Sequence, residues 1–216
     1  MDAVEWLRSL PSESVDLAIT DVPYESLEKH RARGTTTRLR ASWFEIFHNA
    51  RFEELFREVH RVLRNNTHFY FQCDAETMFV AKPIAESVGF KFWKPLVWDK
   101  VSIGMGYHYR SRCEFILFFE KGKRNLNDWG VADIITAKRV FNAGYPTAKP
   151  PEVAEVLISQ STEPGEFVID PFMGSGSVGV ACARVDRLFA GNDLSTSAVE
   201  LARTRIAAAE HRVAFA

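Results

Sequence analysis

The sequence has few cysteines, no long hydrophobic run and almost no net charge. Its three cysteines, Cys73, Cys113 and Cys182, are widely spaced and form no Cys-x-x-Cys pair, which argues against a disulfide framework and a zinc site. No apolar stretch approaches the roughly 20 residues that span a bilayer. The amino terminus lacks the basic-then-apolar order of a signal peptide. We therefore expect a cytoplasmic protein with no metal site and no membrane segment.

The formal net charge of −1 does not indicate a nucleic-acid-binding protein by itself. Locally, however, a basic cluster without any acidic residue comprises Lys29, Arg31, Arg33, Arg38 and Arg40. A solvated surface is the ordinary explanation for such a cluster. Because this one directly follows a loop that we place at the edge of a binding cleft, we predict instead that it contacts phosphate groups.

Strand and helix patterns alternate along the 216 residues. We predict strands over 15–19, 67–73, 90–98, 113–119, 167–169 and 188–190, and helices over 52–63, 76–88, 152–160, 178–184 and 195–209. A long polar loop is expected over 25–42, and residues 121–145 show no clean periodicity and read as a variable insertion. This alternation predicts a single α/β domain over 1–216, with a doubly wound, mostly parallel sheet covered on both faces.

A glycine motif follows the predicted strand at 167–169. Gly174, Gly176 and Gly179 have the spacing G-x-G-x-x-G, and Asp193 follows about 20 residues later, where a carboxylate can accept hydrogen bonds from ribose hydroxyls. The motif alone fits a dinucleotide-dependent oxidoreductase equally well, and the glycines could serve only strand–helix packing. Asp170 and Pro171 precede the glycines and place a carboxylate where it can meet the ammonium group of an amino acid, which favours a different ligand.

The tetrapeptide Asp21-Val22-Pro23-Tyr24 follows the predicted strand at 15–19. An exocyclic amine of a nucleobase is a poor nucleophile, and two acceptors, the Asp21 carboxylate and the Val22 carbonyl, can orient it for attack. Pro23 holds the preceding residue extended, and Tyr24 offers a ring on which an extruded base can stack. Taken alone, the same four residues also fit an ordinary turn. Because parallel strands gather ligands at their carboxyl ends, the two motifs together predict methyl transfer to a nucleobase.

These residues resemble the DNA amino-methyltransferases, which make N6-methyladenine or N4-methylcytosine. The catalytic motif of that family is Asp/Asn/Ser-Pro-Pro-Tyr/Phe, and its cofactor motif is similar to Asp170-Pro171-Phe172-x-Gly174-Ser175-Gly176. The catalytic motif comes first here, as in the circularly permuted β group of this Rossmann-like fold. The segment 113–119 resembles the strand after the base pocket, and the resemblance covers nearly the whole chain.

The resemblance implies S-adenosyl-L-methionine as cofactor and DNA as partner. It implies cofactor contacts by Asp170, Pro171, Phe172, Gly174, Ser175, Gly176 and Asp193, by Thr147 and Lys149 at the methionine end, and by Asp2 at the adenine. Asp rather than Ser at position 21 favours adenine N6 over cytosine N4. Cytosine N4, RNA as substrate and a catalytically silent nucleic-acid-binding subunit remain alternatives.

Two departures from the family pattern and one variable segment shape these expectations. Val22 replaces a proline of which only the carbonyl is needed, and Ser177 replaces the usual threonine. Residues 121–145 are all that is available for target recognition, so we expect a short or relaxed site. For the loop from Tyr107 to Arg110, contact with DNA near the flipped base and plain surface are equally expected. Permuted relatives often dimerise, which predicts a homodimer.

Overall fold

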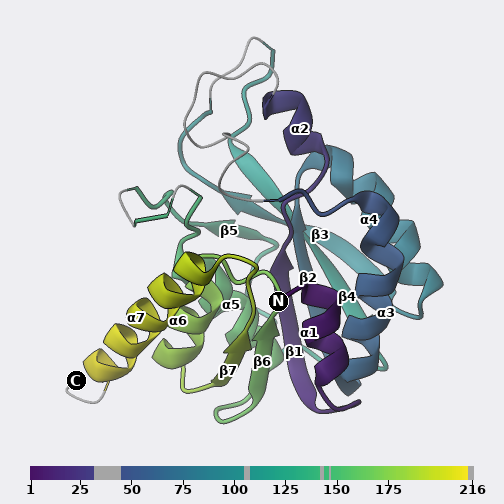
Figure 1. Ribbon diagram of the computed structural model, residues 1–216, viewed down its shortest axis with the longest axis vertical. Helices are drawn as coiled ribbons and strands as arrows, with labels where there is room; N and C mark the ends of the chain where they lie inside the picture. Colours follow the sequence, from purple (N-terminus) through teal and green to yellow (C-terminus); the bar gives the residue numbers. More distant parts are fainter. Residues whose placement is uncertain (32–44, 105–107, 142–143, 146, 214–216) are drawn as a thin grey trace.

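A seven-stranded sheet with the order β5-β3-β4-β2-β1-β6-β7 forms the centre of the computed structural model (Figure 1). The structure describes residues 1–31, 45–104, 108–141, 144–145 and 147–213. β4 is antiparallel to β2 and β3, and the remaining neighbours pair in parallel. The mostly parallel sheet predicted from the sequence is therefore confirmed. The strands are β1 (Val15–Asp21), β2 (Leu63–Cys73), β3 (Lys91–Asp99), β4 (Cys113–Lys121), β5 (Ile134–Thr136), β6 (Phe167–Asp170) and β7 (Leu188–Gly191).

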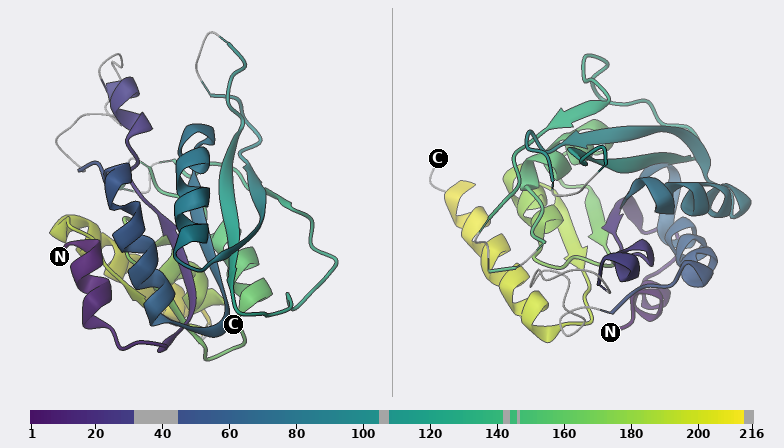
Figure 2. Two further views of the ribbon diagram at one scale, coloured as in Figure 1. Left: turned by 90° about the vertical axis from the view of Figure 1, so that its right-hand side faces the viewer. Right: turned by 90° about the horizontal axis from the view of Figure 1, so that it is seen from above.

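Helices cover both faces of this sheet, as Figure 2 shows from two further sides. One face carries α1 (Ala3–Ser9), α3 (Phe52–Val62) and α4 (Ala75–Ser87), and the other carries α5 (Pro151–Ser161), α6 (Ser177–Arg184) and α7 (Thr196–Val213). A short helix, α2 (Ser26–Arg31), follows β1, and a single 3-10 turn, η2 (Asn49–Arg51), leads into α3. None of the helices in the described ranges is long and apolar enough to cross a membrane.

Successive side chains of the central strands point to opposite faces of the sheet, and this divides the core into two halves. On β2, Phe69 and Phe71 point into the half under α3 and α4, whereas Tyr70 points into the half under α5. Phe119 of β4 stacks on Phe69 with 5.7 Å between ring centroids. Each such buried ring contributes on the order of 1.5–3 kcal/mol relative to an exposed one. This packing on both faces holds the strand ends rigid, and the candidate site is built on those ends.

The structure corrects the sequence-based element assignment in three places. α1 lies where no helix was expected, and α2 occupies the start of the predicted polar loop at 25–42. The predicted insertion at 121–145 contains β5, which pairs with β3 at the edge of the sheet. All three elements are short, so they carry too few apolar repeats for periodicity to reveal them. The last helix begins after Ser195, whose hydroxyl accepts a hydrogen bond from the amide of Ala198 at 3.3 Å.

Candidate active site

The two motif-bearing strands lie next to each other. β1 and β6 pair in parallel, with Leu17 opposite Val168 and Ala18 opposite Ile169. β1 ends at Asp21 and β6 ends at Asp170, so the loops that leave them start at the same edge of the sheet. The connection after β1 leads to β2 on one side, and the connection after β6 leads to β7 on the other. This is a topological switch point, where open α/β sheets bind ligands.

A cleft of about 860 Å³ opens at this edge. It is lined by all but one of the residues predicted to be catalytic or to bind the cofactor, namely Asp2, Asp21, Val22, Pro23, Tyr24, Thr147, Lys149, Asp170, Pro171, Phe172, Gly174, Ser175 and Asp193. The exception is Gly176, which packs against Ala202 of α7. The sheet therefore brings together residues that are far apart in the sequence.

The glycine loop has a shape that side chains would disturb. Gly174 and Gly176 adopt φ values of +47° and +75°, in the left-handed region that favours glycine. A Cβ on Gly176 would also lie 2.7 Å from the Cβ of Ala202 in α7. A Cβ on Gly179 would lie 2.4 Å from the side chain of Ile206, so this third glycine serves helix packing. The loop thus turns tightly beneath the cleft and leaves its backbone accessible there.

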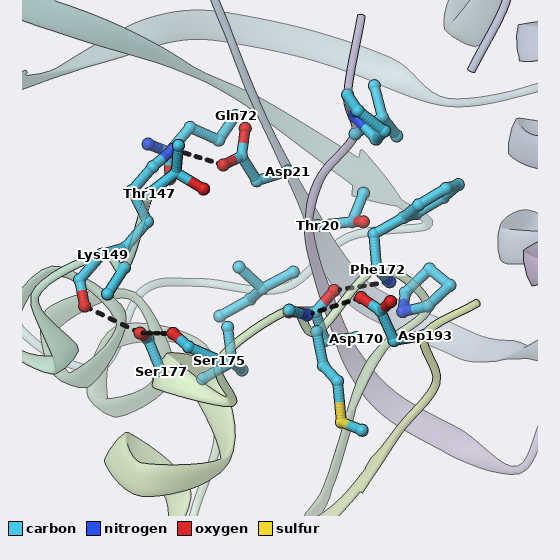
Figure 3. A pocket seen from close by; sticks show the side chains of 18 of the residues that line it. Thr20, Asp21, Gln72, Thr147, Lys149, Asp170, Phe172, Ser175, Ser177 and Asp193 are labelled. Atoms are coloured by element: carbon cyan, nitrogen blue, oxygen red, sulfur yellow. Dashed lines mark hydrogen bonds and ion pairs between the residues drawn. The ribbon is translucent and has the colours of Figure 1, made fainter. Parts of the chain in front are cut away.

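Two carboxylates border the glycine loop (Figure 3). Asp170 is 4% exposed, and its Oδ1 accepts a hydrogen bond of 3.0 Å from the amide of Phe172. Burial raises the pKa of Asp170 to about 8, and the nearby charges of Asp21 and Asp193 add to the effect. Asp193 accepts hydrogen bonds from the amides of Gly174 at 3.0 Å and Ser195 at 2.8 Å. A cationic ligand group would relieve the electrostatic cost of ionising Asp170, so this end of the cleft fits an amino-acid ammonium.

Asp21 belongs to a cluster of charged side chains at the other end of the cleft. The Lys149 ammonium contacts the Asp21 carboxylate and also donates to Glu114 at 3.1 Å. Glu114 further accepts hydrogen bonds from Gln72 at 2.8 Å and from Lys100 at 3.3 Å. Lys149 therefore bridges the ends of β1 and β4. Its sequence motif had indicated contact with the cofactor instead.

Burial and charge act in opposite directions within this cluster. Burial raises the pKa of Asp21, and the Lys149 ammonium opposes that rise. Burial also works to raise the pKa of Glu114, but Lys149, Lys100 and Gln72 together hold it at about 2. The pKa of Lys149 is raised because its two carboxylate partners outweigh its burial. Lys149 and Glu114 are thus charged near neutral pH.

The segment after Asp21 is fixed by the core and by backbone hydrogen bonds. Val22 is buried, and the carbonyl of Pro23 accepts a hydrogen bond of 2.8 Å from the amide of Phe47. The backbone of Tyr24 forms an isolated parallel β-bridge with Phe47. Tyr24 also lines the cleft, and burial raises the pKa of its hydroxyl. Val22 therefore replaces a proline without exposing apolar surface.

Asp2 lines the cleft, and its side chain is held by several partners. Its side chain caps α1 by accepting from the amides of Val4 at 2.9 Å and Glu5 at 3.2 Å. Arg51 binds both carboxylate oxygens, at 2.8 and 3.1 Å. Contact between Asp2 and a cofactor adenine stays a prediction.

The predicted nucleic-acid contacts are only partly described. Lys29 and Arg31 lie in α2, shortly after Tyr24, but their side chains are outside the described part of the chain. Arg33, Arg38, Arg40 and Tyr107 also lie outside the described residues. Arg110 is exposed, and its guanidinium donates to the carbonyl of Gly104 at 2.6 Å.

Sequence reasoning missed several residues on the Asp21 side of the cleft. Gln72, Trp98, Glu114, Arg139 and Tyr145 all line it. Gln72 and Glu114 are polar residues near the ends of otherwise apolar strands, and that contrast was a signal available in the sequence. Within the described ranges, no group of three or more His, Cys, Asp or Glu side chains could hold a metal ion.

Comparison with known proteins places this geometry in a family. The family described as DNA methylase, of the N6/N4 type, matches residues 15–204. Among curated relatives, the type II methyltransferase M.HhaII of Haemophilus parahaemolyticus is 25% identical over 90% of this chain and 89% of its own length. The DNA adenine methyltransferase YhdJ of Escherichia coli K12 is 26% identical over 97% of this chain and 82% of its own.

A solved structure shares the fold. The M1.HpyAVI–SAM complex superposes with a TM-score of 0.72 at 24% identity, covering 95% of this chain and 96% of the other. The family match extends over most of the chain and includes both strand ends that border the cleft. This protein belongs to the N6/N4 DNA methylase family.

Proposed function

We propose that this protein transfers a methyl group from S-adenosyl-L-methionine to the exocyclic N6 of an adenine flipped out of DNA. The observation that carries the proposal is the shared cleft, in which Asp21 at the end of β1 and Asp170 at the end of β6 open on the same side of the sheet. One strand end can then serve the amine and the other the cofactor.

The cofactor end of the cleft has suitable chemistry for S-adenosylmethionine. The buried carboxyl of Asp170 suits the ammonium group, Asp193 suits the ribose, and Phe172 adds an apolar wall. The left-handed glycine loop lets a ligand approach the backbone closely. When bound, this cofactor supplies an electrophilic methyl group on a sulfonium.

The other end of the cleft has suitable groups for the base. Asp21 accepts a hydrogen bond from the target amine and stabilises the positive charge that develops on its nitrogen. The cofactor bound at the other end would supply the methyl group to this nitrogen, whose surplus proton would pass to the Asp21 carboxylate or to water. The Val22 carbonyl is the second acceptor, and the Tyr24 ring is the surface on which the base stacks. Because a paired base cannot reach Asp21, the base must leave the duplex.

The choice of adenine rests on the aspartate at position 21 and on the family resemblance of its motif. The relative YhdJ bears the name of a DNA adenine methyltransferase, which supports the same choice. Incubation with radiolabelled S-adenosylmethionine and either DNA or RNA, followed by nucleoside analysis, tests base and polymer together. Label in N6-methyl-2′-deoxyadenosine, from DNA alone, is expected, and label in N4-methyl-2′-deoxycytidine would move the proposal to the other base.

The matched test of Asp21 compares Asp21→Ala with the wild type in both turnover and cofactor binding. Turnover should fall by about two to three orders of magnitude, the scale of losing one preorganised electrostatic contact. Binding of S-adenosylhomocysteine should persist. Near-normal methylation by the variant would remove Asp21 from the mechanism.

The remaining proposal concerns DNA contact and target length. We place phosphate contacts on Lys29, Arg31, Arg33, Arg38 and Arg40, and contact with DNA near the flipped base on Tyr107 and Arg110. In the segment 121–145, Trp129 is 85% exposed and can meet DNA, whereas Asn127 donates inward to the carbonyls of Ser159 and Thr162 at 2.9 Å. Few side chains are thus left for base reading, and methylation mapping should find a short site. A single strict site of six or more base pairs would contradict this.

A further inference from the structure

We propose that Glu114 and Lys149 are positioning residues for Asp21, each with a different role. This proposal rests on the proposed function. Lys149 holds the Asp21 carboxylate as an anion facing the cleft, and Glu114 keeps Lys149 from pairing with Asp21 alone. Neither residue need touch the substrate, because each acts through the charge and orientation of Asp21.

The geometry supports a fixed arrangement. The backbone of Lys149 is anchored because its carbonyl accepts a hydrogen bond of 2.7 Å from Ser177 at the start of α6. Its ammonium reaches Asp21 on one side and Glu114 on the other (Figure 3 shows the contact with Asp21). Glu114 is in turn held by Gln72 and by Lys100, which is buried. Every member of the bridge thus has a partner that restricts it.

A carboxylate in this position needs such support. The Asp21 side chain is 32% exposed, and its partial burial raises its pKa and so favours the neutral form. A neutral Asp21 would lose most of its attraction for a developing positive charge. Two titratable groups act on Asp21, namely Lys149 before α5 and Glu114 on β4. The charge of Asp21 in turn raises the pKa of the other groups around it, which are Tyr24, Cys73, Tyr145 and Asp170.

Within this set, Lys149 and Glu114 have opposite effects on Asp21. The positive charge of Lys149 lowers the pKa of Asp21, whereas the negative charge of Glu114 raises it. Charges within about 4–6 Å shift a carboxyl pKa by roughly 1–3 units. Removing Lys149 and removing Glu114 should therefore move the titration of Asp21 in opposite directions, which a merely structural role would not do.

The experiment follows the side-chain carboxyl carbon of Asp21 by NMR titration of cofactor-free protein labelled with ¹³C at aspartate, with Asp21→Asn assigning the signal. Lys149→Met should raise the Asp21 pKa by about one unit or more, and Glu114→Gln should lower it by about one unit. Lys149→Arg keeps the charge and should leave the titration close to wild type. Lys94→Met is the matched control, because Lys94 pairs with Asp133 on the surface.

Methylation kinetics supply the second readout. Lys149→Met should move the acidic limb of the kcat–pH profile upward by about one unit or more, in step with the shift seen by NMR, and activity should recover as the pH is raised. Shifts of the same sign in both variants, or none in either, would overturn the proposal. If Lys149→Met fails to fold, the two other single variants test the proposal. Glu114→Gln should then lower the Asp21 pKa, and Lys149→Arg should leave it close to wild type. A wild type that binds DNA but never methylates would sink the proposed function and leave the titration result standing.

Discussion

Cofactor binding should release a proton, because Asp170 sits buried at the carboxyl end of β6. Its pKa of about 8 leaves the carboxyl about tenfold more protonated than ionised at pH 7, and about 30-fold more at pH 6.5. The α-amino group of S-adenosylhomocysteine is itself almost fully protonated at pH 6.5, because a free amino acid is more basic than a peptide N-terminus. Pairing the two should therefore expel about one proton from the complex.

The affinity for S-adenosylhomocysteine should depend on pH for the same reason. Below pH 8, each unit of falling pH reduces the ionised fraction of Asp170 about tenfold, which weakens binding by about 1.4 kcal/mol per unit. The sign follows from the raised pKa, because the protein must lose a proton before it can pair with a cation. Above pH 8 Asp170 is mostly ionised before the ligand binds, so the affinity should stop rising with pH.

Calorimetric titration with S-adenosylhomocysteine in two buffers of different ionisation enthalpy measures the proton count directly. Wild type at pH 6.5 should release about one proton, and Asp170→Asn should release almost none. Asp133→Asn is the matched control, since it removes a surface carboxylate that pairs with Lys94 and does not line the cleft. Tight binding by the wild type without proton release would refute the pairing of Asp170 with the ammonium.

Three further predictions concern stability. His68 is buried with a pKa lowered to about 4 from 6.5, a shift of about 2.5 units, so stability is full above pH 6.5 and should fall by about 3 kcal/mol as the pH drops toward 4. Urea unfolding across that window should show this slope in wild type and a flatter one in His68→Gln. Gly176→Ala should lower the free energy of unfolding by roughly 1–3 kcal/mol, through strain at a positive φ and a clash with Ala202, and a thermal melt should show the lower Tm. Asn127→Ala should cost about 1–3 kcal/mol in unfolding free energy because two carbonyls lose their donor, while DNA affinity by fluorescence anisotropy stays unchanged. A loss of affinity without a loss of stability would place Asn127 at the DNA instead.

The fold could be predicted from the sequence where apolar residues form a continuous run or a regular repeat. Phe69, Tyr70 and Phe71 announce a strand buried on both faces, and the structure has β2 there. Asp21 and Asp170 could be placed at one sheet edge because each follows an apolar run. The three-residue strand β5 could not be predicted, since its position depends on pairing with β3 and not on its own pattern. Periodicity reports the burial of an element, and β5 is mostly exposed.

The bridge from Lys149 to Asp21 shows why the site was harder to predict than the sheet. The two residues are 128 positions apart, and no spacing rule joins them. Their contact follows from a chain of local constraints: Ser177 at the start of α6 holds the Lys149 carbonyl, α6 follows β6, and β6 pairs with β1. Each of these constraints could be inferred from a neighbouring motif. The effect of the Lys149 charge on Asp21, however, also depends on Glu114, which comes from a fourth element, β4. Motifs therefore locate the cleft, and the electrostatic state of its acid is decided only by the assembled sheet.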